Sequence, residues 1–563
     1  MKSLAGLSAL VAFSASALSA FAAPTASVST VTAITVSTPA SSSAPGAVCT
    51  SPPNFTSPDP TFNYTERYRP QFHFSSSTGW INDPNGLVAY NGSFHLFFQY
   101  EPTALHPVNI EWGHAISTDL IHWEELGVAI SSEGQYNIYS GSAVIDYNNT
   151  AGFGADAMVA IYTATDKITN RQAQAIAYST DAGRSFTKYN NGTPVLDINS
   201  TSFRDPKVTW EGDHWLMTAV LASEHKVTFY SSPDLKNWTH LSDFGPGGGP
   251  VGGEFECPDK TEFADPQNPE QNKTVLIVNT NPGGLYGSSG TFYFVGDYNS
   301  TTGFTPDGKG PRWFDYGADS YATVTWNNLP ASVAGPIALP WMNSWAYGQE
   351  IPTYPFRSSH AIPRRLTLRD VNGTNMLHQE PVCTLDKLTT APYQELYGLS
   401  TDSAKSLNLS GKSLRIEAVL KLSNASTGGL NVRVGQNETT AIGYNTTSQE
   451  VYVDRRHSGV SCFNETFAAV HSAPFALEAD GILKLQILVD WASVEVFASS
   501  TGAGQVVLTD LIFPDPSSQG IELFAMGGGE VELVSLKSSG IASIWTGDRA
   551  HETGVECSHS DWW

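Results

Sequence analysis

Short apolar runs, each about the length of a β-strand, alternate with polar turns from residue 72 to about residue 385. The 3.6-residue periodicity of long amphipathic helices is missing from this stretch. Its strongest local signal is Asn91-Gly92, which separates an apolar run at residues 87–90 from another at 94–100. An Asn-Gly pair in this position favours a tight β-hairpin. The pattern therefore predicts a protein of antiparallel strands.

Three of the predicted strand pairs begin with an acidic residue close to a proline. Asp83-Pro84 begins one pair, Asp205-Pro206 begins a second, and Glu256-Cys257-Pro258 begins a looser third. Because proline has no N–H to donate to a ladder, we expect Asp83 at the start of a strand and not in its middle. The recurrence predicts that the three carboxylates occupy equivalent places in a repeated unit.

A second repeat consists of Ser-Thr-Asp or Ser-Pro-Asp, each following a predicted strand and leading to an aromatic residue. Its aspartates are Asp119, Asp181 and Asp234. Aspartate side chains commonly hold turns by hydrogen bonding to nearby backbone groups. We therefore expect these three residues to hold turns and not to take part in chemistry.

Repeats of this length, each with four strands, are typical of a β-propeller. Five blade starts can be recognised, at Asp83, Ser140, Asp205, Glu256 and Ser320. The first strand of each blade lines the central channel, so residues at equivalent blade starts converge on one mouth of it. Five blades leave a narrow channel, which favours a funnel-shaped pocket over a through-pore.

From residue 414 onward, a second set of strands alternates polar and apolar residues, as half-buried antiparallel strands do, and predicts a β-sandwich. The predicted fold is all-β, a five-bladed β-propeller followed by a β-sandwich. We expect the propeller over residues 64–385, a linker over 386–406, the sandwich over 407–545 and a C-terminal tail over 546–563. The sandwich shows no carboxylate cluster, so its expected role is packing and stability.

The N-terminus has the features of a secretory signal: Lys2, an apolar run to Phe21, and a small-x-small cleavage site that ends at Ala22. We expect a signal peptide over residues 1–22 and a Ser/Thr/Pro-rich leader over 23–63. Asn-x-Ser/Thr sequons recur from Asn54 to Asn464, which predicts a glycosylated, secreted protein. No later apolar run is long enough to span a bilayer.

Charge and cysteine content narrow the function. The formal net charge is −24, which argues against nucleic acid or an anionic membrane as a partner, because both need clusters of Lys and Arg. No two of the five cysteines lie at zinc-ligand spacing, and an odd number leaves at least one outside an internal disulfide. Cys257 is the one that we expect to be free. We expect neither a metal nor an organic cofactor.

Three carboxylates from three distant blades suit acid–base chemistry better than calcium, which prefers oxygens that are close together, often in one loop. A retaining glycosidase needs one carboxylate that attacks the anomeric carbon and a second, protonated one that donates to the leaving oxygen. Aromatic rings and amides should surround them, although core packing is an equal alternative for any single Trp. Residues near the blade starts that supply these groups are Trp80, Asn82, Gln99, Trp112, Tyr139, Ser140, Trp341 and Trp345.

Seven motifs, in order, resemble those of glycoside hydrolase family 32, which comprises invertases, exo-inulinases and related fructosyltransferases. The resemblance runs from about residue 68 to residue 545. The motifs are Trp80-Ile81-Asn82-Asp83-Pro84-Asn85-Gly86, Phe98-Gln99-Tyr100, Trp112-Gly113-His114, Tyr139-Ser140-Gly141-Ser142, Phe203-Arg204-Asp205-Pro206, Glu256-Cys257-Pro258 and Trp341-Met342-Asn343-Ser344-Trp345.

The resemblance implies a propeller with a β-sandwich and a retaining mechanism on β-fructofuranosides. Asp83 resembles the nucleophile, Glu256 the acid/base, and Asp205, beside Arg204, the transition-state stabiliser. A Tyr-Gly-x-Asp-x-Tyr-Ala stretch also looks family-like and adds Asp319 and Tyr321. The residues expected to bind substrate are Trp80, Asn82, Gln99, Trp112, Tyr139, Ser140, Arg204, Asp319 and Trp341.

Several alternatives stay open at this point. A fructosyltransferase would use the same intermediate and differ only in whether a sugar hydroxyl or water captures it. We expect that choice to lie on the acceptor side of the pocket, where Phe255 replaces the Trp that usually precedes Glu-Cys-Pro. A non-catalytic fructan-binding protein would lack one of the three carboxylates, and all three are present. Preference among sucrose, inulin and levan, and a monomer against a homodimer, also stay open.

Overall fold

A computed structural model of the chain describes residues 63–546, apart from 248, 251, 424 and 479. The predicted signal peptide, the predicted leader up to residue 62 and residues 547–563 of the predicted tail lie outside the described residues. The described residues form strands β1 to β36 and the short 3-10 helices η1 (Tyr189–Gly192), η2 (Ala222–Glu224) and η3 (Cys383–Leu388). No helix within them is long and apolar enough to cross a membrane.

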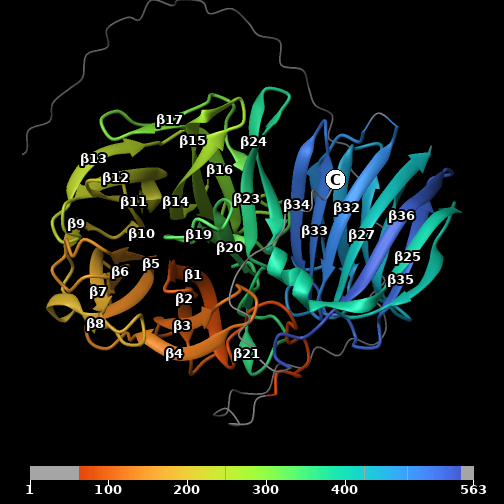
Figure 1. Cartoon of the computed structure of the whole chain (residues 1–563). Helices are drawn as coiled ribbons and strands as arrows, with labels where there is room; N and C mark the ends of the chain where they lie inside the picture. Colours follow the sequence, from red (N-terminus) through yellow and green to blue (C-terminus); the bar gives the residue numbers. More distant parts are fainter. Residues whose placement is uncertain (1–62, 248, 251, 424, 479, 547–563) are drawn as a thin grey trace, which may run out of the picture. The chain divides into compact units, whose positions relative to one another are not determined.

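The prediction of an all-β protein is confirmed, and its first part is a propeller of five sheets (Figure 1). The first two blades are β1 (Gly79–Tyr90), β2 (Ser93–Glu101), β3 (Glu111–Ser117) and β4 (Glu124–Ile130), then β5 (Tyr136–Asp146), β6 (Ala157–Asp166), β7 (Gln172–Ser179), β8 (Thr187–Lys188) and β9 (Leu196–Ser200). Residues 91–92 join β1 to β2, as the Asn-Gly signal predicted.

The last three blades follow the same order. The third blade consists of β10 (Phe203–Trp210), β11 (Trp215–Leu221), β12 (Lys226–Ser232) and β13 (Thr239–Phe244). The fourth consists of β14 (Glu254–Asp265), β15 (Asn268–Asn281), β16 (Gly290–Asn299), β17 (Gly303–Pro306) and β18 (Arg312–Trp313). The fifth consists of β19 (Tyr321–Thr325), β20 (Ile337–Met342), β22 (Ser359–His360), β23 (Arg364–Val371) and β24 (Thr374–Pro381). The short β21 (Phe356–Arg357) returns to pair parallel with β1 and so ties the fifth blade region to the first.

All five inner strands interrupt their ladders at the same place. Pairing skips two residues between Ile81 and Pro84 in β1, Ile138 and Gly141 in β5, Arg204 and Lys207 in β10, Glu256 and Asp259 in β14, and Tyr321 and Val324 in β19. A β-bulge bends a strand and redirects its side chains. The break therefore explains why the blade starts present polar side chains to the axis.

The first break corrects one expectation about Asp83. We expected Asp83 at a strand start, but β1 already begins at Gly79 and Asp83 lies inside it. Pro84 is tolerated there because the ladder is interrupted immediately before it. In β10, β14 and β19, the first of the two skipped residues has a left-handed backbone, with φ of 61° at Asp205, 41° at Cys257 and 52° at Ala322.

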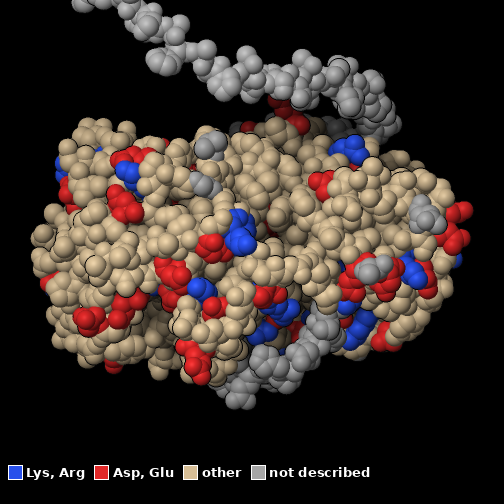
Figure 2. Space-filling view, turned by 90° about the horizontal axis from the view of Figure 1, so that it is seen from above, with Lys and Arg blue, Asp and Glu red and all other residues tan. Residues whose placement is uncertain are grey.

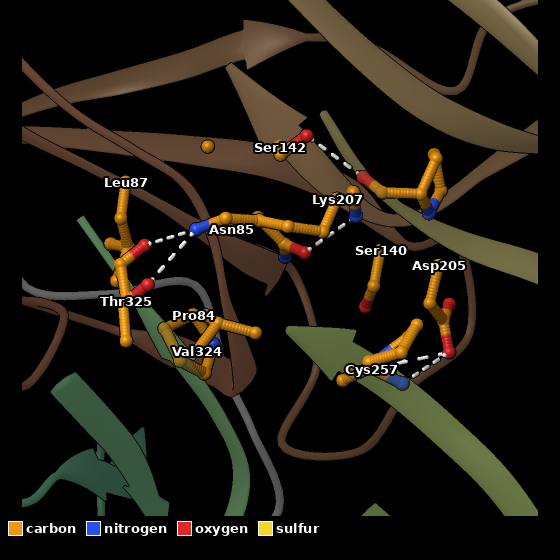
Figure 3. Close-up of a pocket in the computed structure, with 14 residues that line it drawn as sticks. Pro84, Asn85, Leu87, Ser140, Ser142, Asp205, Lys207, Cys257, Val324 and Thr325 are labelled. Carbon is orange, nitrogen blue, oxygen red and sulfur yellow. Dashed lines mark hydrogen bonds between the residues drawn. The ribbon is translucent and has the colours of Figure 1, made fainter. Parts of the chain in front are cut away.

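Beyond the break, polar side chains connect the inner strands across the axis (Figure 3). Asn85 accepts the Gly141 N–H at 3.0 Å. Lys207 Nζ lies 2.9 Å from Asp259 Oδ2 and donates to the Thr325 carbonyl at 2.6 Å. The cavity left between them has a volume of about 10 Å³, close to the smallest that holds a water molecule. These contacts therefore leave little free space along the axis next to Ser140, Asp205 and Cys257, which also line that cavity.

The repeated aspartates hold turns, as predicted. Asp119 accepts the N–H groups of Ile121 and His122, at 3.0 and 2.8 Å. Asp234 accepts the N–H groups of the two residues at the same positions of its own turn, and Asp181 accepts that of Ser185. On the face shown in Figure 2, charged side chains form small separate groups among uncharged ones.

The second part of the chain is a β-sandwich of two six-stranded sheets. One sheet contains β25 (Thr389–Thr401), β36 (Glu530–Ile541), β27 (Leu414–Ser423), β32 (Ile482–Val489), β33 (Ser493–Ser500) and β34 (Gly504–Leu511). The other contains β26 (Lys405–Ser410), β35 (Gly520–Met526), β28 (Thr427–Val434), β29 (Thr439–Asn445), β30 (Glu450–His457) and β31 (Val470–Pro474). Alternate apolar side chains from both sheets form one core, which includes Ile416, Leu430 and Leu485.

Residues 386–406 are not the linker that we expected. They contain the whole of β25, a strand of the first sandwich sheet that pairs antiparallel with β36 from Thr389↔Ile541 to Thr401↔Val531. Its partner lies more than a hundred residues later in the chain, so local patterning does not reveal the pairing. The propeller therefore passes into the sandwich through η3, directly after β24.

Two buried ionic networks join the propeller to the sandwich. In the first, Arg364 of β23 donates to Asp315 at 2.9 Å and to Glu495 of β33 at 2.6 Å. His73 lies between Glu495 and Asp490, at 2.7 and 2.8 Å. Burial alone would lower the pKa of His73, but these two carboxylates outweigh it and raise the pKa to about 9. His73 is therefore a cation at neutral pH.

The second network is centred on Arg455 of β30. Its Nη1 lies 2.6 Å from Asp319 Oδ2, and its Nη2 donates to the Tyr347 hydroxyl at 2.8 Å. That hydroxyl in turn donates to Asp319 Oδ1 at 2.7 Å. Asp510 lies 3.5 Å from the same guanidinium. All four residues are buried, so the charges depend on one another for compensation.

We expect Arg455→Met to destabilise the protein strongly. Removing one member of a buried ion pair leaves an uncompensated charge and costs about 3–5 kcal/mol. The measurement is the urea concentration at the midpoint of unfolding. Lys273→Met is the matched control, because its partner Asp297 is 66% exposed and such a pair contributes less than about 1 kcal/mol. Equal midpoints for the two variants would contradict the prediction.

Candidate active site

Asp83, Asp205 and Glu256 come from β1, β10 and β14 and meet at one mouth of the propeller. Cys257 connects the first two. Its backbone N–H donates to Asp205 Oδ2 at 3.0 Å, and its Sγ lies 3.5 Å from Asp83 Oδ2 and 3.8 Å from Asp205 Oδ2. Figure 3 shows Cys257 facing Asp205, with Ser140 close by. Three carboxylates that are far apart in the sequence thus share one small volume.

Arg204 is the cation of this cluster. Its Nη2 donates to Glu256 Oε1 at 3.0 Å and to Glu254 Oε2 at 2.6 Å, and its Nε lies 3.7 Å from Asp205 Oδ2. Burial alone would lower the pKa of Arg204, but Glu256 and Asp205 raise it above its ordinary value. The guanidinium therefore stays charged among the carboxylates.

Burial also shapes the protonation of the acids. It is the largest cause that raises the pKa of Asp205 and of Glu256. Arg204 opposes the rise in both, and the negative charge of Asp83 adds to it in both. A carboxyl group whose pKa is raised in this way can hold a proton near neutral pH. The cluster thus contains carboxyl groups suited to giving and taking a proton.

The carboxylate of Asp83 is held on both oxygens. Ser140 Oγ donates to Oδ2 at 2.6 Å, and Asn82 Nδ2 donates to Oδ1 at 3.1 Å. Trp80 Nε1 donates to Asn82 Oδ1 at 2.7 Å, which fixes the orientation of that side-chain amide because the indole N–H is only a donor. The chain Trp80–Asn82–Asp83 therefore sets the direction of one carboxylate.

Aromatic side chains form a wall beside the carboxylates. The ring centroids of Trp80 and Trp341 are 5.8 Å apart, and Trp345 lies 5.7 Å from Trp80 and 5.1 Å from Trp341. Trp80 and Trp341 are buried, whereas Trp345 is half-buried. Within the described residues, Trp341 Nε1 and the buried Gln99 Nε2 have no hydrogen-bond partner. A buried donor without a partner costs free energy unless water or a ligand completes its hydrogen bond.

Trp112 and Tyr139 lie close to the site in different ways. Trp112 is fully buried, and its Nε1 donates to the Tyr139 carbonyl at 3.0 Å. It thereby supports the backbone immediately before Ser140 from behind. Tyr139 itself is half-buried. Burial is the main cause that raises the pKa of its phenol, and the charges of Arg204, Asp205 and Glu256 also act on it.

One predicted substrate-binding residue lies elsewhere. Asp319 is fully buried in the ionic network with Arg455, at the junction with the sandwich, and cannot contact a substrate. Tyr321, two residues later, takes the place in the site instead, because its hydroxyl donates to Glu256 Oε2. Both residues belong to one family-like motif, so the motif located the segment but not the side chain that points into the site.

The position of Phe255 also differs from the one we expected. We expected it on the acceptor side of the pocket, but it is 4% exposed. Its ring packs against Phe292 at 5.5 Å and His225 at 5.2 Å, in the core between the third and fourth blades. Successive side chains of a strand point to opposite faces, so Phe255 faces away from the mouth while Glu254 and Glu256 face it.

As predicted, Cys257 is a free thiol among the described residues, and the structure shows that it is buried. Cys383 and Cys462 are disulfide-bonded, and Cys49 and Cys557 lie outside the described residues. No group of three or more His, Cys, Asp or Glu side chains in the described part of the chain has the arrangement of a metal site.

The sequence matches known families over most of its length. Residues 73–381 match the domain described as Glycosyl hydrolases family 32 N-terminal domain, and residues 384–539 match Glycosyl hydrolases family 32 C terminal. The chain belongs to glycoside hydrolase family 32. It is accordingly a glycoside hydrolase of the β-fructofuranosidase type.

Named relatives agree with the family assignment. The chain is 38% identical to an extracellular exo-inulinase of Aspergillus awamori over 527 residues, which cover 86% of this chain and 96% of the relative. It is 40% identical to a levanase of Bacillus subtilis over 497 residues, covering 86% and 72%. An invertase of Schizosaccharomyces pombe is also 40% identical, covering 62% of this chain and 60% of the relative.

Solved structures share the fold of this family 32 protein. The exo-inulinase of Aspergillus awamori superposes with a TM-score of 0.80 at 38% identity, covering 86% of this chain and 100% of that one. The fructofuranosidase of Schwanniomyces occidentalis, complexed with fructose, has a TM-score of 0.77 at 31% identity, covering 85% and 99%.

Proposed function

We propose that this enzyme hydrolyses terminal β-D-fructofuranosyl residues of sucrose, fructans or both, through a covalent fructosyl-enzyme. The observation that carries the proposal is that two carboxyl groups lie at one mouth of the propeller in different environments. Asp83 has hydrogen-bond donors on both oxygens, whereas burial and the charge of Asp83 raise the pKa of Glu256. A retaining glycosidase needs this division between an ionised nucleophile and a protonated acid.

In the first half of the reaction, an oxygen of Asp83 attacks the anomeric carbon of the fructosyl unit while the glycosidic bond breaks. Glu256 gives its proton to the departing oxygen. Positive charge grows on the fructose ring in the transition state, and the carboxylates of Asp83 and Asp205 stabilise it because they are fixed in place beforehand. We assign Gln99 Nε2 and Trp341 Nε1 as donors to fructosyl hydroxyls; both atoms are buried and without partners among the described residues, so substrate binding has to open a path to them.

In the second half, Glu256 takes a proton from water as the water oxygen attacks the same carbon. The bond to Asp83 breaks, fructose leaves, and both carboxyl groups return to their starting states. Transfer to a sugar hydroxyl in place of water would use the same intermediate and the same base. The hydrolytic proposal is supported by relatives named exo-inulinase, levanase and invertase.

We also propose that the enzyme is secreted and glycosylated. The predicted signal peptide, the leader and the recurring sequons support this, as do relatives that are named extracellular exo-inulinases.

Asp83→Asn is expected to abolish turnover of sucrose while leaving the fold intact. An amide cannot attack the anomeric carbon, and loss of a nucleophile lowers kcat by at least roughly 10⁴-fold. The measurement is the initial rate of fructose release, with circular dichroism as the check on folding. Asp213→Asn, at an 89% exposed side chain in the same blade as Asp205, should behave as wild type. Near-normal activity of the Asp83 variant would refute its assignment.

Tyr321→Phe is expected to move the basic limb of the pH profile of kcat/KM to higher pH. The Tyr321 hydroxyl donates to Glu256 and favours its ionised form, so it lowers the pKa of that group. Without the hydroxyl, Glu256 keeps its proton to higher pH, and the limb reports that proton in the free enzyme. Tyr298→Phe, a hydroxyl with no partner among the described residues, is the control. A limb that stays or moves to lower pH would contradict the assignment of Glu256.

Hydrolysis and transfer are separated by a product time course on concentrated sucrose. If water captures the intermediate, we expect glucose and fructose in equal amounts throughout. Glucose well above fructose, with trisaccharides appearing, would show that sucrose is the acceptor and that the enzyme is a fructosyltransferase.

A further inference from the structure

A fourth carboxylate, Glu254, lies at the mouth beside the three that the mechanism uses. It begins β14, two residues before Glu256, so the two side chains point to the same face of the strand. Its side chain is 49% exposed, compared with 24% for Glu256 and 7% for Arg204. Glu254 therefore stands between the buried charges and solvent.

Glu254 competes with Glu256 for one nitrogen. Arg204 Nη2 is 2.6 Å from Glu254 Oε2 and 3.0 Å from Glu256 Oε1. The contact with Glu254 is the shorter of the two, and Arg204 makes only a single contact with Glu256 instead of the two-pronged pairing that a guanidinium commonly forms with a carboxylate. The arrangement weakens the hold of Arg204 on Glu256.

We propose that Glu254 is a positioning residue: it forms a hydrogen-bonded ion pair with Arg204, weakens the contact of Arg204 with Glu256, and so keeps Glu256 available as the proton donor. This inference rests on the proposed function, because it assumes that Glu256 is the acid. A fully paired Arg204 would stabilise the carboxylate form of Glu256 and withdraw it from that task. Glu254 prevents this while leaving Arg204 close enough to hold the side chain of Glu256 in place.

The other charged and titratable groups around Glu256 do not replace this effect. They are Asp83 from β1, Tyr139 from β5, Arg204 and Asp205 from β10, Cys257 from β14 and Tyr321 from β19. Arg204 is the cation among them, and Glu254 is the carboxylate on its solvent side. Neutralising Glu254 therefore leaves more of the Arg204 charge acting on Glu256, which favours ionisation.

The test is the pH profile of kcat/KM on sucrose for Glu254→Gln. We expect the basic limb to move to lower pH, the direction opposite to that of Tyr321→Phe. On the basic side kcat/KM should fall several-fold, whereas on the acidic side it should stay close to that of wild type. On a fructoside whose leaving group needs no proton, the variant should retain wild-type kcat.

Glu262→Gln is the matched control. Glu262 lies on the same strand, its side chain is 39% exposed, and it pairs with Lys260 at 2.9 Å, so its loss removes a similar surface ion pair away from the mouth. We expect its pH profile to match that of wild type. A basic limb that is unmoved in Glu254→Gln would overturn the proposal. A raised KM for sucrose at unchanged limbs would also overturn it, because Glu254 would then act on the substrate directly.

Glu256→Gln distinguishes a failure of the inference about Glu254 from a failure of the proposed function. If that variant loses turnover of sucrose but still releases the leaving group of the activated fructoside in a burst, as the fructosyl-enzyme forms and then waits for a base, the acid role stands and the result for Glu254 decides the inference alone. If Glu256→Gln turns over sucrose normally with an unchanged profile, the proposed function itself fails, and the inference fails with it.

Discussion

The site depends on one cation, Arg204, among carboxylates that would otherwise repel one another. Like charges a few ångströms apart in a poorly solvated site cannot all stay ionised, so either a proton or a cation must compensate them. Here both do. Arg204 contacts Glu254 and Glu256 and lies near Asp205, and burial raises the pKa of Asp205 and of Glu256. One guanidinium cannot neutralise all of these carboxylates. One carboxyl group can therefore hold a proton to donate while its neighbour stays ionised as the nucleophile.

Such a cluster opposes folding, so the surrounding framework must stabilise it. The ladder breaks in the five inner strands turn polar groups toward the axis, and contacts such as Lys207 with Asp259 tie those strands together below. The sandwich contributes as well. Its Arg455 holds Asp319 and Tyr347, which lie two residues from Tyr321 and from Trp345. The sandwich is thus more than the packing partner that we expected, because one of its buried cations anchors two segments that line the site.

Much of the fold could be predicted from local patterns. Strand-sized apolar runs, the Asn91-Gly92 turn and the recurring Asp-Pro units indicated the blades, because each of these signals is set by neighbouring residues. The convergence of Asp83, Asp205 and Glu256 followed from the propeller topology. What could not be predicted depended on side-chain direction or on distant pairing. Asp319 and Tyr321 share a motif, yet the segment leads into a strand with a ladder break, so alternation does not say which of them reaches the site. The strand β25 looked like a linker because its partner, β36, is remote in the sequence.

The position of Phe255 bears on how an acceptor is chosen. Whichever acceptor captures the fructosyl-enzyme, the same base must deprotonate it, so Asp83, Asp205 and Glu256 serve water and sugar alike. A residue that favours one acceptor has to touch it, and the buried ring of Phe255 does not reach the mouth. Half-exposed groups beside the carboxylates do, and Trp345 and Glu254 are two of them. A flat indole offers a stacking surface to a sugar, whereas a carboxylate engaged with Arg204 attracts water as readily as a hydroxyl. The half-exposed indole of Trp345 is therefore the rim group that is placed to meet an acceptor directly, whereas Glu254 acts through Arg204.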